Sequence, residues 1–330
     1  MRPDVTEKRH QGSAASGRLI TVAGEALIDL IVDARGRVRP SPGGGAFNTA
    51  RTIARLGQPV TFLGRLSGDR FGRGLADLLA ADGVRLQVPA DAGEPTTLAV
   101  LDIDPAGVAS YRFYLSGTAA AALSRAEVPA GTAALHIGTL SLIMEPIAST
   151  IEELVRSLPD TALLMLDPNC RPSAIGDKEA YLARLARLLP RADVVKASAE
   201  DLAYLSAPAS CVPGLLSGGP AGLLSGGPGA VVVTDGAADV RVFTADGQVT
   251  STNVPPVDVV DTVGAGDAFG GAFLAWWVGN GLTRAGVGKS ELVTAATVAA
   301  VAAAAITCTR TGAEPPWRTE LHGKPGWSAP

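Results

Sequence analysis

The chain is poor in the residues that build disulfide frameworks, zinc sites and histidine-based catalytic centres. Its 330 residues include three cysteines and three histidines. The cysteines, at positions 170, 211 and 308, have unrelated spacings and form no Cys-x-x-Cys pair, and two of the histidines lie near the chain ends. We therefore expect no disulfides, no zinc site and no Ser-His-Asp triad. This cysteine usage is typical of a reduced, cytoplasmic protein.

An excess of positive charge is also missing. The formal net charge is −4, so no nucleic-acid or membrane-surface partner is expected. Residues 1–17 are polar and lack the apolar segment of a signal peptide, and they are predicted to be a flexible tail, as are residues 322–330. The longest apolar run, Val293 to Ile306, is too short to span a bilayer and predicts a buried helix.

What the chain does contain is an alternation of strand and helix patterns. Hydrophobic residues make up 47% of the sequence, enough for a large α/β domain, and the alternation favours βαβ units with a mostly parallel central sheet. Two hairpin patterns, at about 30–42 and 95–116, depart from it. We predict that they form a small sheet that acts as a lid on a single domain of residues 18–321. Alternatively, they extend the edge of the main sheet.

The most informative motif is Asp261 to Phe269, read DTVGAGDAF, which precedes a long apolar helix pattern. Glycine-rich backbone at a helix start leaves N–H groups open to an anion, and the helix dipole adds positive potential. The predicted donors are the N–H groups of Gly264, Ala265 and Gly266. Asp267 at the rim suits a general base in phosphoryl transfer to an alcohol. The simpler alternative is a carboxylate that only stabilises the helix start.

A second glycine-rich turn, Pro42 to Ala50, also runs into a helix pattern. Its glycines allow close approach of a ligand to the backbone. Asn48 is predicted at the helix start, where it caps the helix or offers its amide to a hydroxyl. Asp29, predicted at the end of the first strand, is a further candidate for sugar hydroxyls. A helix cap and a turn aspartate are the structural alternatives for these two residues.

These two stretches resemble the two signatures of the ribokinase, or PfkB-type, carbohydrate kinases. Gly43 to Gly72 is similar to the first signature and Asp261 to Leu274 to the second, in the same order and at a similar separation. The resemblance covers roughly residues 18–321. It implies a three-layer α/β/α body with a β-sheet lid, and ATP and Mg²⁺ as cofactors. A monovalent cation near Asp261 is also compatible with the resemblance.

The resemblance also implies roles for single residues. Asp267 would be the general base, and residues 264–266 would form the anion hole. Gly43 and Gly44 match the hinge of the lid, while Asp29 and Asn48 match the sugar-hydroxyl contacts.

The nucleotide and metal motifs depart from the family pattern. The family's Asn-x-x-Glu corresponds here to Ser198 and Asp201, with Glu200 as a competitor for the magnesium-side role, through water. Lys196 precedes this motif and is assigned to ATP binding. The nucleotide loop lacks its last glycine, and Thr234 and Gly236 remain the candidate ATP contacts.

The sugar is predicted to be fructose, because residues 24–30, 167–172 and 307–313 resemble the fructokinase branch. The second of these segments also occurs in 2-keto-3-deoxygluconate kinases. Arg171 is a candidate for a phosphate oxygen or a substrate carboxylate, or is a structural ion-pair partner.

Rival functions remain open. A nucleoside kinase would need an apolar slot, which Phe47, Tyr111 and Phe113 could line. A ribose kinase and a non-catalytic sugar- or nucleotide-binding relative are further alternatives. The protein is expected to be a monomer or a homodimer paired through the lid sheet.

Overall fold

The computed structural model describes residues 18–103, 109–206 and 218–327. Two sheets organise this part of the chain, and the predicted α/β class with a mostly parallel central sheet is confirmed. The large sheet has nine strands in the order β13-β12-β11-β10-β9-β8-β1-β4-β5, and the small sheet has four in the order β3-β2-β6-β7. The hairpins therefore do not extend the edge of the main sheet.

The strands of the large sheet are β1 (Leu19–Ala23), β4 (Val60–Leu63), β5 (Arg85–Leu86), β8 (Thr132–Gly138), β9 (Leu163–Asp167), β10 (Val194–Ser198), β11 (Ala230–Asp235), β12 (Ala238–Thr244) and β13 (Val249–Thr252). Those of the small sheet are β2 (Leu27–Val32), β3 (Val38–Gly43), β6 (Leu98–Ile103) and β7 (Ala109–Tyr114). In the large sheet, each pair of neighbours from β5 through β4, β1, β8, β9 and β10 to β11 is parallel. Strand β12 pairs antiparallel with both β11 and β13.

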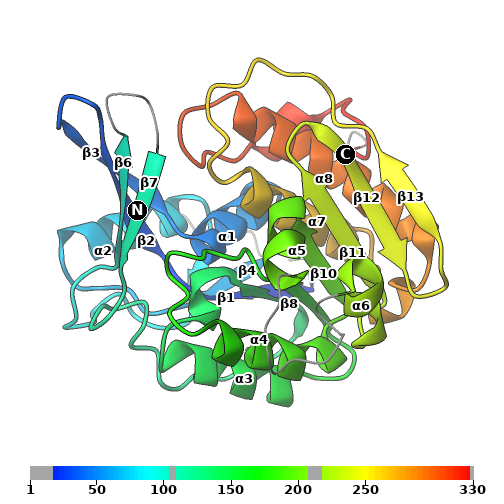
Figure 1. Ribbon diagram of the computed structural model, residues 1–330, viewed down its shortest axis with the longest axis horizontal. Helices are drawn as coiled ribbons and strands as arrows, with labels where there is room; N and C mark the ends of the chain where they lie inside the picture. Colours follow the sequence, from blue (N-terminus) through cyan, green and yellow to red (C-terminus); the bar gives the residue numbers. More distant parts are fainter. Residues whose placement is uncertain (1–17, 104–108, 207–217, 328–330) are drawn as a thin grey trace, which may run out of the picture.

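Helices cover both faces of the large sheet (Figure 1). One buried core lies between the sheet and α1 (Gly45–Arg55), α2 (Arg70–Ala81), α7 (Ala265–Gly279) and α8 (Ser290–Cys308). A second core lies on the opposite face, under α3 (Ile147–Ser157), α4 (Lys178–Leu188), α5 (Ala199–Ser206) and α6 (Gly219–Ser225). The result is the predicted three-layer α/β/α arrangement. Short 3₁₀ turns η1 (Thr139–Leu142), η2 (Leu189–Arg191), η3 (Arg284–Gly286) and η4 (Arg318–Leu321) complete the elements.

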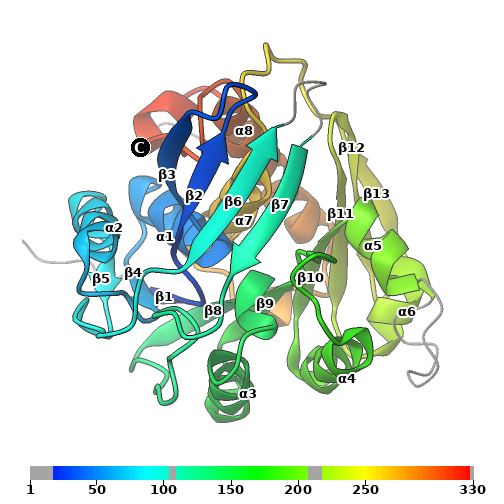
Figure 2. The same cartoon turned by 60° about the vertical axis from the view of Figure 1, so that its left-hand side comes forward.

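The small sheet projects from the body beside α1, and Figure 2 shows its four strands face on. Strand β2 pairs antiparallel with β3 and parallel with β6, and β6 pairs antiparallel with β7. Asp29 lies inside β2, opposite Ser41. The prediction that Asp29 ends the first strand is therefore wrong, because β1 stops at Ala23 and the chain enters the small sheet after it.

Three other segments bear on the predictions. Among the described residues, α8 is the one helix long and apolar enough to cross a membrane, but it packs against α7, β12 and β13 as the predicted buried helix. Residues 322–327 are not a loose tail, because Trp327 is buried and its indole N–H donates to the Ala299 carbonyl at 2.9 Å. The apolar residues Val259 and Val260 form no strand and are more than half exposed, at 62% and 61%. Residues 1–17 lie outside the described part.

Candidate active site

The predicted site residues gather at the carboxyl ends of the parallel strands. The chain runs from β1 to its neighbour β4 and later returns to β8 on the other side of β1, so the strand order reverses at β1. Ligands of open α/β sheets bind at such a switch point, outside the carboxyl ends of the strands. The small sheet is attached here, because β2 follows β1 directly and β3 leads directly into α1.

Asp267 and Asn48 meet at this edge although 219 residues separate them. Helix α7 begins at Ala265 after Gly264, whose φ of 77° lies in the left-handed region, and this places Asp267 in the first turn. The Asn48 amide donates to Asp267 Oδ2 at 2.8 Å. Because α1 begins at Gly45, Asn48 is already within the helix and does not cap it. The cap alternative for Asn48 is therefore wrong.

The start of α7 has open backbone donors. The Gly264 and Gly266 N–H groups have no acceptor among the described residues, whereas the Ala265 N–H donates to the Thr262 carbonyl at 3.2 Å. Of the three predicted anion-hole donors, Ala265 is thus already engaged. Burial raises the pKa of Asp267, although the Asn48 hydrogen bond and the charge of Lys196 oppose the shift.

Lys196 lies beneath this helix start. A Cβ atom on Gly266 would be only 2.9 Å from Lys196 Nζ, so the ammonium group sits against the backbone of the glycine turn. Lys196 is buried on β10 and donates to Asp167 Oδ2 at 2.9 Å. Burial alone would lower the pKa of Lys196, but Asp167 and Asp201 raise it, so the group is charged. A fixed positive charge therefore reinforces the helix start as an anion site.

The small sheet presents Asp29 and Phe113 on one face. Asp29 is in register with Ala99, and Ala99 with Phe113, and neighbours in register point to the same side of a sheet. Burial raises the pKa of Asp29 to about 6, and the charge of Asp267 adds to the shift. A Cβ on Gly43 would lie 2.2 Å from Asp29 Oδ2, so this carboxylate occupies the space that a side chain at position 43 would need.

The remaining predicted residues surround this centre. Arg171 is exposed and donates to the Cys170 carbonyl of its own loop at 3.1 Å. Its charge opposes the rise in pKa that burial causes at Asp29 and Asp267. Thr234 is the last residue but one of β11 and is in register with Ser198 on β10, and Gly236 lies in the exposed turn that follows the strand.

The polar groups of Ser198 and Asp201, which were predicted to lie on the metal side, mostly form hydrogen bonds within the protein. Ser198 and Asp201 form a reciprocal pair at the start of α5, in which the Asp201 N–H donates to Ser198 Oγ at 3.0 Å and the Ser198 N–H donates to Asp201 Oδ2 at 2.7 Å. The other oxygen of Asp201 accepts the Cys170 N–H at 2.6 Å. Glu200 is exposed. The described residues contain no cluster of three or more His, Cys, Asp or Glu side chains arranged for a metal ion.

Sequence reasoning missed three polar residues of the site. Glu25 follows β1, Thr139 follows β8 and Asp167 ends β9, and all three are buried. A polar residue directly after a buried parallel strand is a signal that could have found Glu25 and Asp167. Thr139 follows β8 directly and carries the same signal, but its left-handed φ of 62° could not be predicted, because it depends on contacts in the fold.

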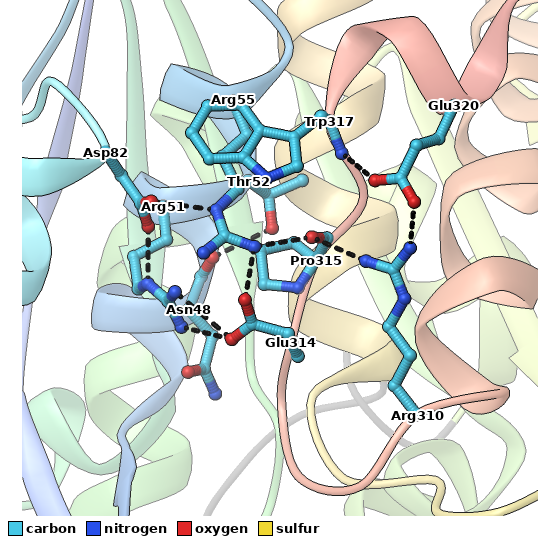
Figure 3. A network of polar contacts seen from close by, with 10 residues as sticks. All are labelled: Asn48, Arg51, Thr52, Arg55, Asp82, Arg310, Glu314, Pro315, Trp317 and Glu320. Carbon is cyan, nitrogen blue, oxygen red and sulfur yellow. Dashed lines mark hydrogen bonds and ion pairs between the residues drawn. The ribbon is translucent and has the colours of Figure 1, made fainter.

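Helix α1 is tied to the C-terminal segment by a network of ion pairs, in which the side chains of Arg51, Arg55 and Asp82 are buried and that of Glu314 is 44% exposed (Figure 3). Arg51 and Arg55 both contact Asp82, at 2.6 and 2.9 Å, and both contact Glu314. Two residues before Glu314, the Gly312 N–H donates to Asp261 Oδ2 at 2.9 Å. The network therefore fixes the loop that borders the start of the second signature.

Comparison with known proteins agrees with this geometry. Residues 18–320 match the model of the pfkB family carbohydrate kinases. A fructokinase of Rhizobium leguminosarum bv. trifolii is 36% identical over 267 residues, which are 78% of this chain and 79% of the relative.

Two solved structures are similar as well. Fructokinase with bound ATP from Xylella fastidiosa has a TM-score of 0.79 and 28% identity, covering 90% of this chain and 94% of that one. A double mutant of fructokinase from Vibrio cholerae O395, with fructose, ADP and a potassium ion bound, has a TM-score of 0.77 and 27% identity, with the same coverage. The chain belongs to the pfkB family of carbohydrate kinases and is a sugar phosphotransferase.

Proposed function

We propose that this sugar kinase uses ATP and that its substrate is fructose, phosphorylated at a primary hydroxyl. The similar proteins are fructokinases, and two of their structures hold ATP, or fructose with ADP. The observation that carries the proposal is the Asn48–Asp267 hydrogen bond of 2.8 Å beside the open N–H groups of α7. A fixed carboxylate next to an anion site is the arrangement that phosphoryl transfer to an alcohol requires.

In the proposed mechanism, Asp267 accepts the proton of the sugar hydroxyl while the hydroxyl oxygen bonds to the γ-phosphorus of ATP; the bond from that phosphorus to the bridging oxygen breaks, and ADP leaves. The N–H groups of Gly264 and Gly266, together with Lys196 beneath them, stabilise negative charge on the phosphoryl oxygens. Asp29 and Asn48 bind other hydroxyls of the sugar. The small sheet closes as a lid about Gly43 and Gly44, which excludes water and limits hydrolysis of ATP.

We assign the binding site of the nucleotide to the carboxyl ends of β10 and β11. Thr234 and Gly236 would contact its phosphates and ribose, and Ser198 lies next to Thr234 in register. Mg²⁺ would arrive with the phosphates and supply positive charge. Both oxygens of Asp201 already accept hydrogen bonds, which does not fit a metal contact, so the exposed Glu200 is the better candidate for its water shell.

Three further assignments remain proposals. Potassium in the Vibrio cholerae structure supports a monovalent cation near Asp261, whose carboxylate joins the two neighbouring loops through the Val263 and Gly312 N–H groups. Arg171 would bind a phosphate oxygen, and Phe113 would pack against the sugar. We also propose one kinase domain of residues 18–321 in a cytoplasmic protein, as a monomer or as a homodimer paired through the small sheet.

The test is ADP release with Mg·ATP and a panel of fructose, ribose, 2-keto-3-deoxygluconate, adenosine or no sugar. Turnover with fructose above the others is expected. Turnover with another compound of the panel and not with fructose would overturn the assignment of fructose as the substrate but keep the mechanism. Turnover with adenosine would indicate that the base binds near the stacked rings of Tyr111 and Phe113, whose centroids are 6.1 Å apart. Asp267→Asn should abolish turnover and keep sugar binding. If the wild-type protein releases no ADP with any compound of the panel but still binds ATP or a sugar, a non-catalytic binding protein would be favoured.

A further inference from the structure

Glu25 is a buried carboxylate at the point where both strands of the first hairpin join the body. It lies between β1 and β2, and only 1% of its surface is exposed. Its backbone carbonyl accepts the Phe47 N–H at 3.2 Å. A Cβ on Gly44, whose φ is 105°, would lie 2.8 Å from the same carbonyl oxygen. The residue therefore touches the entry to β2 and the exit from β3 at once.

The carboxylate joins two elements that the chain places far apart. Glu25 Oε1 accepts the N–H of Gly45, the first residue of α1, at 2.9 Å, and Oε2 accepts the Ser141 N–H at 3.1 Å. The Thr139 hydroxyl donates to the same carboxylate, at 2.5 and 2.6 Å from its two oxygens. Burying a carboxylate is costly unless its oxygens are paired, and here the pairing ties α1 to the turn after β8.

Thr139 shows how closely the parts are fitted. Its φ of 62° is unfavourable for a β-branched residue and persists where contacts over-determine it. Its Cγ2 methyl lies 2.3 Å from where a Cβ on Gly45 would be. The methyl thus fills the space left by the glycine, and the hydroxyl is held by Glu25.

The start of α1 matters because Asn48 lies on its first turn, where the Asn48 N–H donates to the Gly44 carbonyl at 3.0 Å. Asn48 in turn donates to Asp267. We propose that Glu25 is a positioning residue, which holds the first turn of α1 so that Asn48 keeps Asp267 aligned and the body side of the hinge stays rigid. This inference rests on the proposed role of Asp267.

The test compares Glu25→Gln with wild type by two measurements. The first is amide hydrogen exchange of the peptide covering residues 43–50, which needs no substrate. Glu25→Gln keeps the size of the side chain but places an NH₂ group against N–H donors, so faster exchange is expected in this peptide. The second is steady-state kinetics with the sugar that the wild type uses. We expect kcat to fall about 10- to 100-fold, with KM for the sugar within about threefold.

A second variant and a control separate positioning from general destabilisation. Thr139→Val keeps the shape of the side chain and removes the hydroxyl, so it should reproduce both effects. Asp193→Asn alters another buried carboxylate, which accepts the Leu164 N–H at 2.8 Å at the opposite ends of the strands. It should lower stability without faster exchange in residues 43–50 or a lower kcat of the folded enzyme.

Unchanged exchange in Glu25→Gln would overturn the proposal, whichever sugar the enzyme uses. Faster exchange with unchanged kcat would also overturn it, because the anchor would then have no effect on Asp267. If the wild type phosphorylates no sugar of the panel, the proposed function fails separately, and the exchange data still decide whether Glu25 holds the start of α1.

Discussion

Replacing Asn48 with alanine removes the amide that donates to Asp267 Oδ2 at 2.8 Å. This bond stabilises the ionised carboxylate and opposes the rise in the pKa of Asp267 that burial causes. A hydrogen bond to a charged group contributes about 1.5–3 kcal/mol. Loss of this hydrogen bond should therefore raise the pKa of Asp267 further, and about 1.4 kcal/mol corresponds to a tenfold change.

The expected result is a shift of the acidic limb of the pH–rate profile to higher pH. Asp267 must be ionised to accept a proton, so kcat/KM of Asn48→Ala should fall about 10- to 100-fold on that limb and recover as the pH rises. The measurement is kcat/KM for the sugar across the pH range. Thr49→Val is a matched control, because Thr49 donates to the Asp267 main-chain carbonyl at 3.3 Å and not to the carboxylate. The acidic limb of the pH–rate profile of Thr49→Val should stay at the wild-type pH.

An equal loss of activity at every pH would refute the reasoning. In that case Asn48 would act only through its proposed contact with the sugar and not on the charge of Asp267, and most of the effect would be on KM. A shift of the limb in Thr49→Val as large as that in Asn48→Ala would also contradict it, since the shift would then reflect a general displacement of α7.

Three further predictions concern the surroundings of this pair. Asp82→Asn leaves the two buried arginines of α1 with Glu314 as their carboxylate partner, and urea unfolding should show a loss of about 2–4 kcal/mol, with an unchanged m-value. Gly43→Ala places a Cβ 2.2 Å from the position of Asp29 Oδ2, so the Asp29 carboxylate must move. In steady-state kinetics the KM for the sugar should rise about tenfold and the KM for ATP should stay unchanged, and equal increases in both would contradict this. Burial raises the pKa of Glu25 to about 7; the folded state then holds this proton more tightly than the unfolded state, so stability is greatest below the unfolded pKa and should fall by about 3 kcal/mol as the pH rises to about 7. Urea unfolding of Glu25→Gln from pH 5 to pH 8 should show a shallower fall, and an unchanged slope would contradict the assignment.

Local sequence patterns were sufficient to predict many of the strands of the central sheet. Short apolar runs next to turn residues are typical of buried parallel strands and predict strands at Leu19–Ala23 and Val60–Leu63. These are the bounds of β1 and β4. The sequence reasoning missed α3, which begins after Pro146 without a side-chain cap, and the pair β12 and β13. These two strands are short and alternate exposed and buried residues only in part. Their place in the sheet depends on the pairing of β12 with β11 and on packing against α8, which the local sequence does not reveal.

The site was harder to predict because its contacts are distant in sequence. The glycine turns identified both ends of the Asn48–Asp267 pair, but the bond spans 219 residues and depends on α1 starting at Gly45. One turn of difference in that start separates a helix cap from a partner of the catalytic candidate. Register had the same effect at Asp29, whose direction follows from its pairing with Ser41 and Ala99 in the small sheet.

The electrostatics of the site follow from the same long-range assembly. Burial raises the pKa of Glu25, Asp29 and Asp167 to about 7, 6 and 6, and that of Asp267 above its ordinary value. Each carboxylate comes from a different element, and the buried cation Lys196 pairs with one of them, Asp167. Since like charges at close range oppose ionisation, neutralising Glu25 should ease ionisation of Asp267, whereas loosening α1 should oppose it. The two effects act in opposite directions on the pH profile, which is why hydrogen exchange, and not the profile, decides the role of Glu25.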